Sequence, residues 1–247
     1  MKIDLKDLTF IIPFSYDSIE RAENLNYILG FFRDNFKTNI VLIESGTNQF
    51  LFSEDYLNSS NYLFSPTSNE IFHRTKVINA GIKKAKTPYI AIYDTDVFIS
   101  PIENYLKGVE LLKQGHKIVY PYDGRFIDVE RSLIKDGIIK EYQSCATGSY
   151  GGCVLLNRET YIKAGIENEN LYGWGFDDFE RKERMEILGN HAARIEGICY
   201  HIKHPLGINS SVQNPNWQKN KEEYERIKIM SEQQLRDEIK TWQWTKR

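Results

Sequence analysis

The first hundred residues alternate continuous apolar runs with longer segments in which apolar residues recur at helical spacing. The runs occupy residues 8–14, 39–44, 61–64 and 89–93, the last followed by Asp94-Thr95-Asp96. Continuous runs of this kind are typical of strands that are buried on both faces. Between them, residues 18–35, with Ser18 as a possible cap, and residues 69–86 have the periodicity of amphipathic helices. The order predicts an α/β fold with a mixed, mainly parallel sheet flanked by helices.

The second half of the chain continues the alternation less regularly. We expect strands at 117–122, 153–156 and 194–201, and helices at 102–114, 158–164, 177–188 and 219–242. Residues 124–146 are mixed and charged, and we interpret them as a loop or an insertion. We therefore predict one domain over residues 1–218, with halves that meet near residue 100, and a helical extension over 219–247.

Composition limits the possible partners of the chain. Its 247 residues are 41% hydrophobic and 27% charged, with a net charge of −2, which gives no indication of nucleic-acid binding. No apolar run reaches the length of a transmembrane helix. The acidic start lacks the apolar region of a signal peptide, and the three cysteines are odd in number and lack metal-site spacing. These features favour a cytoplasmic protein with reduced thiols.

Two aspartates follow the apolar run at 89–93. In a strand Asp94 and Asp96 would point to the same side, at the carboxyl end where ligands bind in open α/β sheets. Two neighbouring carboxylates repel each other unless a cation lies between them, and a divalent ion that carries a diphosphate would meet this need. The alternative is a pair of turn-forming aspartates around Thr95.

Basic residues lie on the helix that precedes this strand. Arg74 offers a planar fork and Lys76 a point charge, both suited to phosphate oxygens, and Asn79 could contact a base or ribose. The alternative is a solvated basic helix face.

A glycine-rich segment, Gly173-Trp174-Gly175-Phe176, precedes another predicted helix. Trp174 between two glycines is well placed to stack on a sugar ring. Asp177 and Asp178 begin the helix, where a carboxylate could act as a general base or simply favour the helix dipole.

His201 and His204 come at the end of the last predicted strand. Imidazole suits transition ions such as Mn²⁺, but both rings could bind one ion only if the chain turns after His201. The alternative is a structural histidine pair. The motifs of serine hydrolases, Walker A proteins and dinucleotide-binding folds are absent from the sequence.

Taken in order, these blocks resemble the metal-dependent glycosyltransferases of the GT-A fold, in particular the β-1,4-galactosyltransferase family and the bacterial chondroitin-polymerase-type transferases. Four segments over residues 9–205 carry the resemblance: Ile11-Ile12-Pro13-Phe14, then Arg74 to Gly81 with Asp94-Thr95-Asp96, then Gly151-Gly152 with Gly173 to Asp178, and finally His201 to His204.

The resemblance implies an inverting transfer of a sugar from a UDP-sugar to a glycan or lipid-linked glycan, with Mn²⁺ or Mg²⁺, in the synthesis of bacterial surface polysaccharide. The implied metal ligands are Asp96, His204 and His201. The implied nucleotide contacts are Pro13, Arg21, Glu44, Arg74, Lys76, Asn79, Asp94 and Thr95. The implied sugar contacts are Trp174, Gly152, Tyr150 and Ser149.

Departures from the family pattern refine these roles. Phe176 and Asp177 replace a glycine and a glutamate of the family, so the catalytic base falls on Asp178, with Asp177 beside it. Ser149 stands where the galactosyltransferases have a tyrosine near the C2 substituent of the sugar. The smaller side chain leaves room for an N-acetyl group, which favours UDP-GalNAc over UDP-Gal.

Two other functions stay open at this point: a retaining glycosyltransferase of the same fold, and a sugar-binding module without catalysis. The C-terminal helix carries Trp242 and Trp244 beside basic residues. It either packs on the domain with a frayed end or contacts the membrane surface where lipid-linked acceptors lie.

Overall fold

The computed structural model describes residues 2–51, 61–135, 138–139 and 144–246. The strands are β1 (Ile3–Phe14), β2 (Phe36–Gly46), β3 (Asn61–Pro66), β4 (Tyr89–Tyr93), β5 (Val97–Ser100), β6 (Ile118–Tyr120), β7 (Arg125–Val129), β8 (Ile134–Lys135), β9 (Ile138–Ile139), β10 (Ser144–Ala146), β11 (Cys153–Asn157), β12 (Ala193–Arg194) and β13 (Ile198–Ile202). The helices are α1 (Ile19–Asn35), α3 (Arg74–Lys84), α4 (Asn104–Lys113), α5 (Arg158–Lys163), α6 (Asp177–Ile187), α7 (Trp217–Lys228) and α8 (Glu232–Thr241), with short 3₁₀ turns η1 (Arg131–Leu133) and η2 (Gln243–Lys246).

The main sheet has seven strands in the order β12-β6-β11-β4-β1-β2-β3. The pairs β4–β1, β1–β2, β2–β3 and β6–β12 are parallel, and β11 is antiparallel to both of its neighbours. The predicted mixed, mainly parallel sheet is confirmed. A second sheet, β10-β7-β13-β5, continues from the end of β4 and brings the last strand, β13, beside β5.

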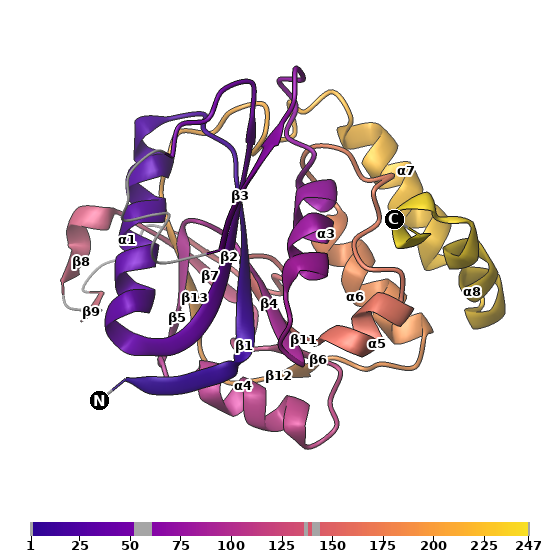
Figure 1. Cartoon of the computed structure of the whole chain (residues 1–247), viewed down its shortest axis with the longest axis horizontal. Coiled ribbons are helices and arrows are strands. Elements are labelled where there is room, and N and C mark those ends of the chain that lie inside the picture. Colours follow the sequence, from indigo (N-terminus) through magenta and orange to yellow (C-terminus); the bar gives the residue numbers. More distant parts are fainter. Residues whose placement is uncertain (1, 52–60, 136–137, 140–143, 247) are drawn as a thin grey trace.

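Helices α1 and α3 cover opposite faces of the main sheet (Figure 1). Neighbouring residues of a strand point to opposite faces, and here the ring of Phe10 lies 4.4 Å from that of Phe32 in α1 while Ile11 faces α3. A side chain at Gly81 of α3 would approach Ile11 and Ile43 to 2.5 and 2.7 Å. The glycine therefore lets α3 lie directly on the sheet, which fixes the position of its first residue, Arg74.

The end of β4 differs from the prediction. The strand stops at Tyr93, and Thr95 and Asp96 form a turn before β5 crosses into the second sheet. Residues 124–146 also differ, because their described parts supply β7 and β10 to that sheet, so they are not a plain loop.

The C-terminal segment forms two helices where one was predicted. Helix α7 ends at Lys228, and Ser231 caps the start of α8 with a reciprocal capping box. Trp242 and Trp244 are buried, and the indole nitrogen of Trp244 donates to the carbonyl of Gly165. The two tryptophans thus pack on the domain, as the first of the two alternatives expects. Among the described residues, we find no helix with the length and apolar character needed to span a bilayer.

Candidate active site

A cavity of about 420 Å³ lies at the carboxyl ends of β1 and β4 and at the start of α3. The second sheet and the loop before α6 complete its wall. Its lining contains five aspartates, two arginines and two histidines. The residues are Pro13, Arg21, Phe72, Arg74, Asp94, Thr95, Asp96, Phe126, Asp128, Ser149, Gly151, Gly152, Gly173, Trp174, Asp177, Asp178, His201, His204, Leu206, Asn209 and Ser210. Segments that are far apart in the sequence therefore contribute to one polar site.

Asp96, His201 and His204 converge on one side of the cavity. Their ligand atoms all lie within 4.8 Å of one another, and Asp96 Oδ2 is 3.1 Å from His204 Nε2. β13 ends at Ile202, and the turn that follows brings His204 back to the same carboxylate as His201. The chain therefore turns after His201, as binding of one ion by both imidazoles requires. One carboxylate and two imidazoles form a donor set suited to a transition ion.

Charged neighbours orient this cluster. Asp128 Oδ1 lies 2.8 Å from His201 Nδ1, which leaves the other ring nitrogen of His201 facing Asp96. Burial alone would lower the pKa of His201, but the hydrogen bond to Asp128 and the charge of Asp96 raise it above its ordinary value. Burial alone would raise the pKa of Asp96. The hydrogen bond of His204 and the charges of His201 and Arg21 outweigh burial and keep Asp96 ionised.

Arg74 bridges two carboxylates on the other side of the cavity. Its guanidinium donates to Asp94 Oδ1 at 2.6 Å and to Asp177 Oδ2. Burial and the negative charge of Asp178 raise the pKa of Asp177, although Arg74 acts in the opposite direction. The two aspartates of the Asp94-Thr95-Asp96 turn consequently have different partners: Asp94 pairs with Arg74, while Asp96 faces the histidines.

Asp178 is held by a buried arginine. Arg181 donates to Asp178 Oδ1 at 2.7 Å and to both carboxylate oxygens of Glu167 at 2.7 and 3.0 Å. Arg181 and Glu167 are fully buried, whereas the side chain of Asp178 is 25% exposed. Since Arg181 engages Oδ1, Oδ2 is the oxygen that faces Gly151 and the cavity. A positioned carboxylate with one open oxygen can accept a proton from a bound hydroxyl.

Glycines shape the approach to Asp178. Gly173 and Gly175 adopt positive φ values of 87° and 105°, and a side chain at Gly173 would lie 2.5 Å from Asn214. Asn220 of α7 donates to the carbonyls of Tyr172 and Trp174. This support presents the Trp174 side chain, 38% exposed, at the cavity mouth.

Comparison with known proteins shows which proteins the chain is similar to. No protein-family model matches the chain. Over 146 residues, or 58% of its length, it is 22% identical to β-1,4-galactosyltransferase 1 from Bos taurus, and the match covers 33% of that protein. The chain thus spans about a third of the curated relative it matches.

Solved structures extend the likeness over most of the chain. The structure of GalNAc-T7 with UDP, GalNAc and Mn²⁺ superposes with a TM-score of 0.53 at 14% identity, covering 81% of this chain and 44% of the other. A mannosyltransferase from Pyrobaculum calidifontis in complex with GDP-Man and Mn²⁺ gives 0.52 at 14% identity, covering 81% and 58%. The chain has the GT-A fold of glycosyltransferases.

Within this GT-A fold, most predicted site residues reach the cavity. Those that line it are Pro13, Arg21, Arg74, Asp94, Thr95, Asp96, Ser149, Gly152, Trp174, Asp177, Asp178, His201 and His204. Their chemical roles stay predictions. Gly152 has a positive φ of 78°, and a side chain there would lie 2.9 Å from the Cys199 sulfur, so the glycine is required sterically.

Three predicted nucleotide contacts lie elsewhere. Lys76 is exposed and does not line the cavity, because residues two apart on a helix do not share a face and Arg74 takes the inward one. Asn79 is buried, and its side-chain amide exchanges two hydrogen bonds with the backbone of Glu167. It thus joins α3 to the segment before α6. Glu44 is buried and accepts hydrogen bonds from the backbone nitrogens of residues 50 and 51. Its carboxylate stabilises that loop.

Tyr150 also departs from its predicted role. It does not line the cavity, although Ser149 and Gly151 on either side of it do. The guanidinium of Arg194 lies 4.4 Å from the centre of the Tyr150 ring, and Tyr120 contacts the ring edge to face. These contacts hold the Tyr150 ring against neighbouring side chains. Of the two aromatic residues predicted to contact a sugar, only Trp174 lines the cavity.

Two residues that sequence reasoning missed complete the site. Asp128 lies on β7, in the stretch interpreted as a loop or an insertion, and the local pattern of residues 125–129 did not single it out. Arg181 lies one helical turn after Asp178, at the i,i+3 spacing that pairs charges on a helix. That spacing was visible in the sequence, but its burial against Glu167 was not.

Proposed function

We propose that this chain transfers a sugar from a UDP-sugar to a hydroxyl group of a glycan, with the help of Mn²⁺. The observation that carries the proposal is the arrangement of one cavity. A cluster with transition-metal donors lies on one side, and Asp178, with an oxygen open to the cavity, lies on the other. The GT-A fold, shared with structures that contain Mn²⁺ and a nucleotide or nucleotide sugar, supports the same activity.

The residues present fit a divalent ion. Asp96, His201 and His204 would hold it, and Asp128 would keep His201 oriented with one ring nitrogen toward Asp96. When bound, the ion would neutralise negative charge on the diphosphate of the leaving UDP. Mg²⁺ is the second candidate, but the two imidazoles favour Mn²⁺.

Cations and a small side chain suit the donor. Arg21 and Arg74 line the cavity on either side of the Asp94-Thr95-Asp96 turn, and both place positive charge near the proposed diphosphate. Ser149 lines the cavity and accepts a hydrogen bond from the Gly151 nitrogen. Because its side chain is small, we propose a donor with a 2-acetamido sugar, UDP-GalNAc before UDP-Gal.

Asp178 supplies the proton acceptor. Its Oδ2 takes the proton of the acceptor hydroxyl as the hydroxyl oxygen bonds to C1 of the donor sugar. The bond from C1 to the phosphate oxygen breaks, and the electron pair leaves with UDP. Attack opposite to the leaving group inverts the anomeric configuration without a covalent intermediate. Arg181 holds Asp178 in place through its other oxygen, Oδ1.

The acceptor lies beside Trp174, whose ring at the cavity mouth offers a stacking surface for a sugar. We propose a glycan or lipid-linked glycan as acceptor and a role in bacterial surface polysaccharide synthesis.

A donor screen tests this function. The purified protein is incubated with UDP-GalNAc, UDP-Gal, UDP-GlcNAc or UDP-Glc, with Mn²⁺ or with EDTA, and UDP release is measured. We expect Mn²⁺-dependent turnover, fastest with UDP-GalNAc. Binding of a sugar without turnover of any donor would instead indicate a non-catalytic module. A product with the α configuration would indicate a retaining transferase.

A further inference from the structure

A second cavity, of about 680 Å³, lies between α1, β5 and the start of α4. It shares no lining residue with the candidate active site. β5 separates the two: Asp96 precedes the strand, and Ser100, which ends it, lines the second cavity. This cavity is therefore a separate feature of the fold that the transfer reaction does not use.

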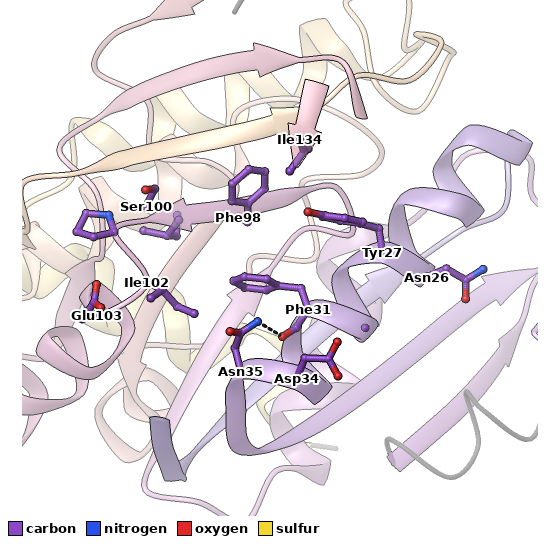
Figure 2. Close-up of a pocket in the computed structure, with 13 residues that line it drawn as sticks. Asn26, Tyr27, Phe31, Asp34, Asn35, Phe98, Ser100, Ile102, Glu103 and Ile134 are labelled. Carbon is purple, nitrogen blue, oxygen red and sulfur yellow. Dashed lines mark hydrogen bonds between the residues drawn. The ribbon is translucent and has the colours of Figure 1, made fainter. Parts of the chain in front are cut away.

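Aromatic rings form the inner wall of this cavity. Figure 2 shows the side chains of Tyr27, Phe31 and Phe98 gathered around it. The rings of Phe31 and Phe98 lie 6.3 Å apart and are tilted by 50°. Phe98 is buried, while Tyr27 and Phe31 are half-buried. The negative face of an aromatic ring attracts weakly positive C–H groups, such as those on the apolar face of a pyranose.

Polar groups lie around the aromatic wall. Asp34 and Glu103 contribute carboxylates, and Asn26 and Asn35 contribute amides. The Asn35 amide donates to the carbonyl of Phe31 at 2.9 Å, which holds it in one orientation (Figure 2). Carboxylates and amide oxygens accept hydrogen bonds from hydroxyl groups. Aromatic faces beside such acceptors suit a ligand with apolar C–H faces and many hydroxyls.

The charge of the lining narrows the ligand further. None of its 13 residues is lysine, arginine or histidine, whereas two are acidic. The candidate active site, by contrast, contains Arg21, Arg74 and two histidines. Arg33 lies beside the cavity at Gly30 and pairs with Asp34 at 3.6 Å, so the lining carries little net charge. Without a lysine, arginine or histidine in its lining, the cavity suits neutral sugars rather than phosphates or uronic acids.

We propose that this second cavity is a binding site for neutral saccharides, with room for one or two pyranose units of a glycan chain. Its volume lies within the range of about 300–1,000 Å³ of small-ligand sites. The inference depends on the lining of the cavity and stands whether or not the active site transfers sugar as proposed.

Gly30 offers a way to fill the cavity. It lines the cavity from the interior of α1, and the only atom near an added Cβ is the tip of the Arg33 side chain, at 3.8 Å. Because an added Cβ has room at residue 30, we expect the indole of Gly30→Trp to occupy this space. Gly30→Ala is the matched control, because it adds one methyl group and leaves the cavity open. Both replace a helical glycine, which favours the helix by up to about 1 kcal/mol, so neither variant should unfold.

Saturation-transfer NMR titrations with lactose, cellobiose and N,N′-diacetylchitobiose, without nucleotide or metal, test the site. We expect saturable binding by the wild type, by Gly30→Ala and by Trp174→Ala, which removes the sugar contact at the active site. Gly30→Trp should bind at least about tenfold more weakly, since the aromatic wall is covered. UDP titration of each variant checks that the active site is intact.

Two results would overturn the proposal. One is equal saccharide affinity in Gly30→Trp and the wild type, with loss of binding in Trp174→Ala. The other is the absence of saturable binding by the wild type with all three disaccharides. If sedimentation velocity then showed a dimer that Gly30→Trp dissociates, the cavity would belong to a second copy of the chain.

Discussion

Asp178 and Gly151 face each other so closely that a Cβ atom at residue 151 would lie 3.0 Å from Asp178 Oδ2. The other oxygen of Asp178 is held by Arg181. The carboxylate therefore has one bound oxygen and one open oxygen, and the space in front of the open one depends on the missing side chain of Gly151.

This relationship predicts the effect of Gly151→Ala. The added methyl group would push Oδ2 away from the acceptor hydroxyl, and small displacements of a catalytic group cost about 100-fold in rate. We expect kcat for donor turnover to fall by about that factor with an unchanged Kd for UDP. Gly207→Ala is the control, because nothing lies within 4 Å of a Cβ there. Wild-type kcat in Gly151→Ala would show that Asp178 does not act at this position.

Asp128→Asn should weaken metal binding without removing a proposed ligand. The neutral amide keeps the shape of Asp128 but loses the charge that orients and polarises His201. Calorimetric titration with Mn²⁺ should show an affinity about 10 to 100 times lower. Asp237→Asn, on the remote helix α8, should leave the affinity unchanged. An unaltered Mn²⁺ affinity in Asp128→Asn would place the ion away from His201.

Ser149→Tyr should change the choice of donor. A ring at this position would fill the space that we assign to the 2-acetamido group, so the ratio of UDP-GalNAc to UDP-Gal turnover should fall by about tenfold or more. Ser149→Ala keeps the space and should keep the ratio. Equal turnover of the two donors by the wild type would already contradict the role of Ser149.

The Glu167–Arg181 pair predicts how stability depends on pH. Burial alone would raise the pKa of Glu167, but Arg181 outweighs it and holds the pKa below its ordinary value. A depressed folded-state pKa stabilises the fold above the unfolded pKa of about 4.3, and this stabilisation is lost as the pH falls through the folded value. Glu167→Gln should cost up to about 3–5 kcal/mol of unfolding free energy at pH 7, because the buried Arg181 then keeps only Asp178 as a charged partner.

Urea unfolding from pH 7 to pH 3 measures this effect. The difference in unfolding free energy between the wild type and Glu167→Gln should shrink as the pH drops below about 4.3. Glu159→Gln breaks an exposed pair with Lys163 and should leave stability almost unchanged. A difference for Glu167→Gln that stays constant down to pH 3 would rule out the assigned role of this pair.

The sequence predicted the location of those site residues that follow directly from the order of strands and helices. The carboxyl ends of β1 and β4 meet at one edge of the sheet, so Pro13, Asp94 and Asp96 were expected there and lie there. The strand argument for the two aspartates was nevertheless wrong in detail. The chain turns after Tyr93, so their common location follows from a turn and not from a strand continued to Asp96.

Residues whose role depends on tertiary contacts were not predictable. Nothing local to Asn79 or Glu44 shows that a backbone segment will use their hydrogen-bonding groups. Asp128 lies beside His201 only because β7 pairs with β13 in the second sheet. That pairing joins residues more than seventy positions apart in the sequence. Long-range pairing of this kind leaves little trace in a local sequence pattern.

The central claim is that Asp178 takes the proton in a metal-dependent sugar transfer, and Asp178→Asn tests it most directly. Donor turnover with UDP-GalNAc and Mn²⁺ is measured beside calorimetric binding of UDP and Mn²⁺. The account predicts a rate about 10² to 10⁴ times lower than wild type, with both affinities unchanged. Wild-type turnover in Asp178→Asn, with binding intact, would contradict it.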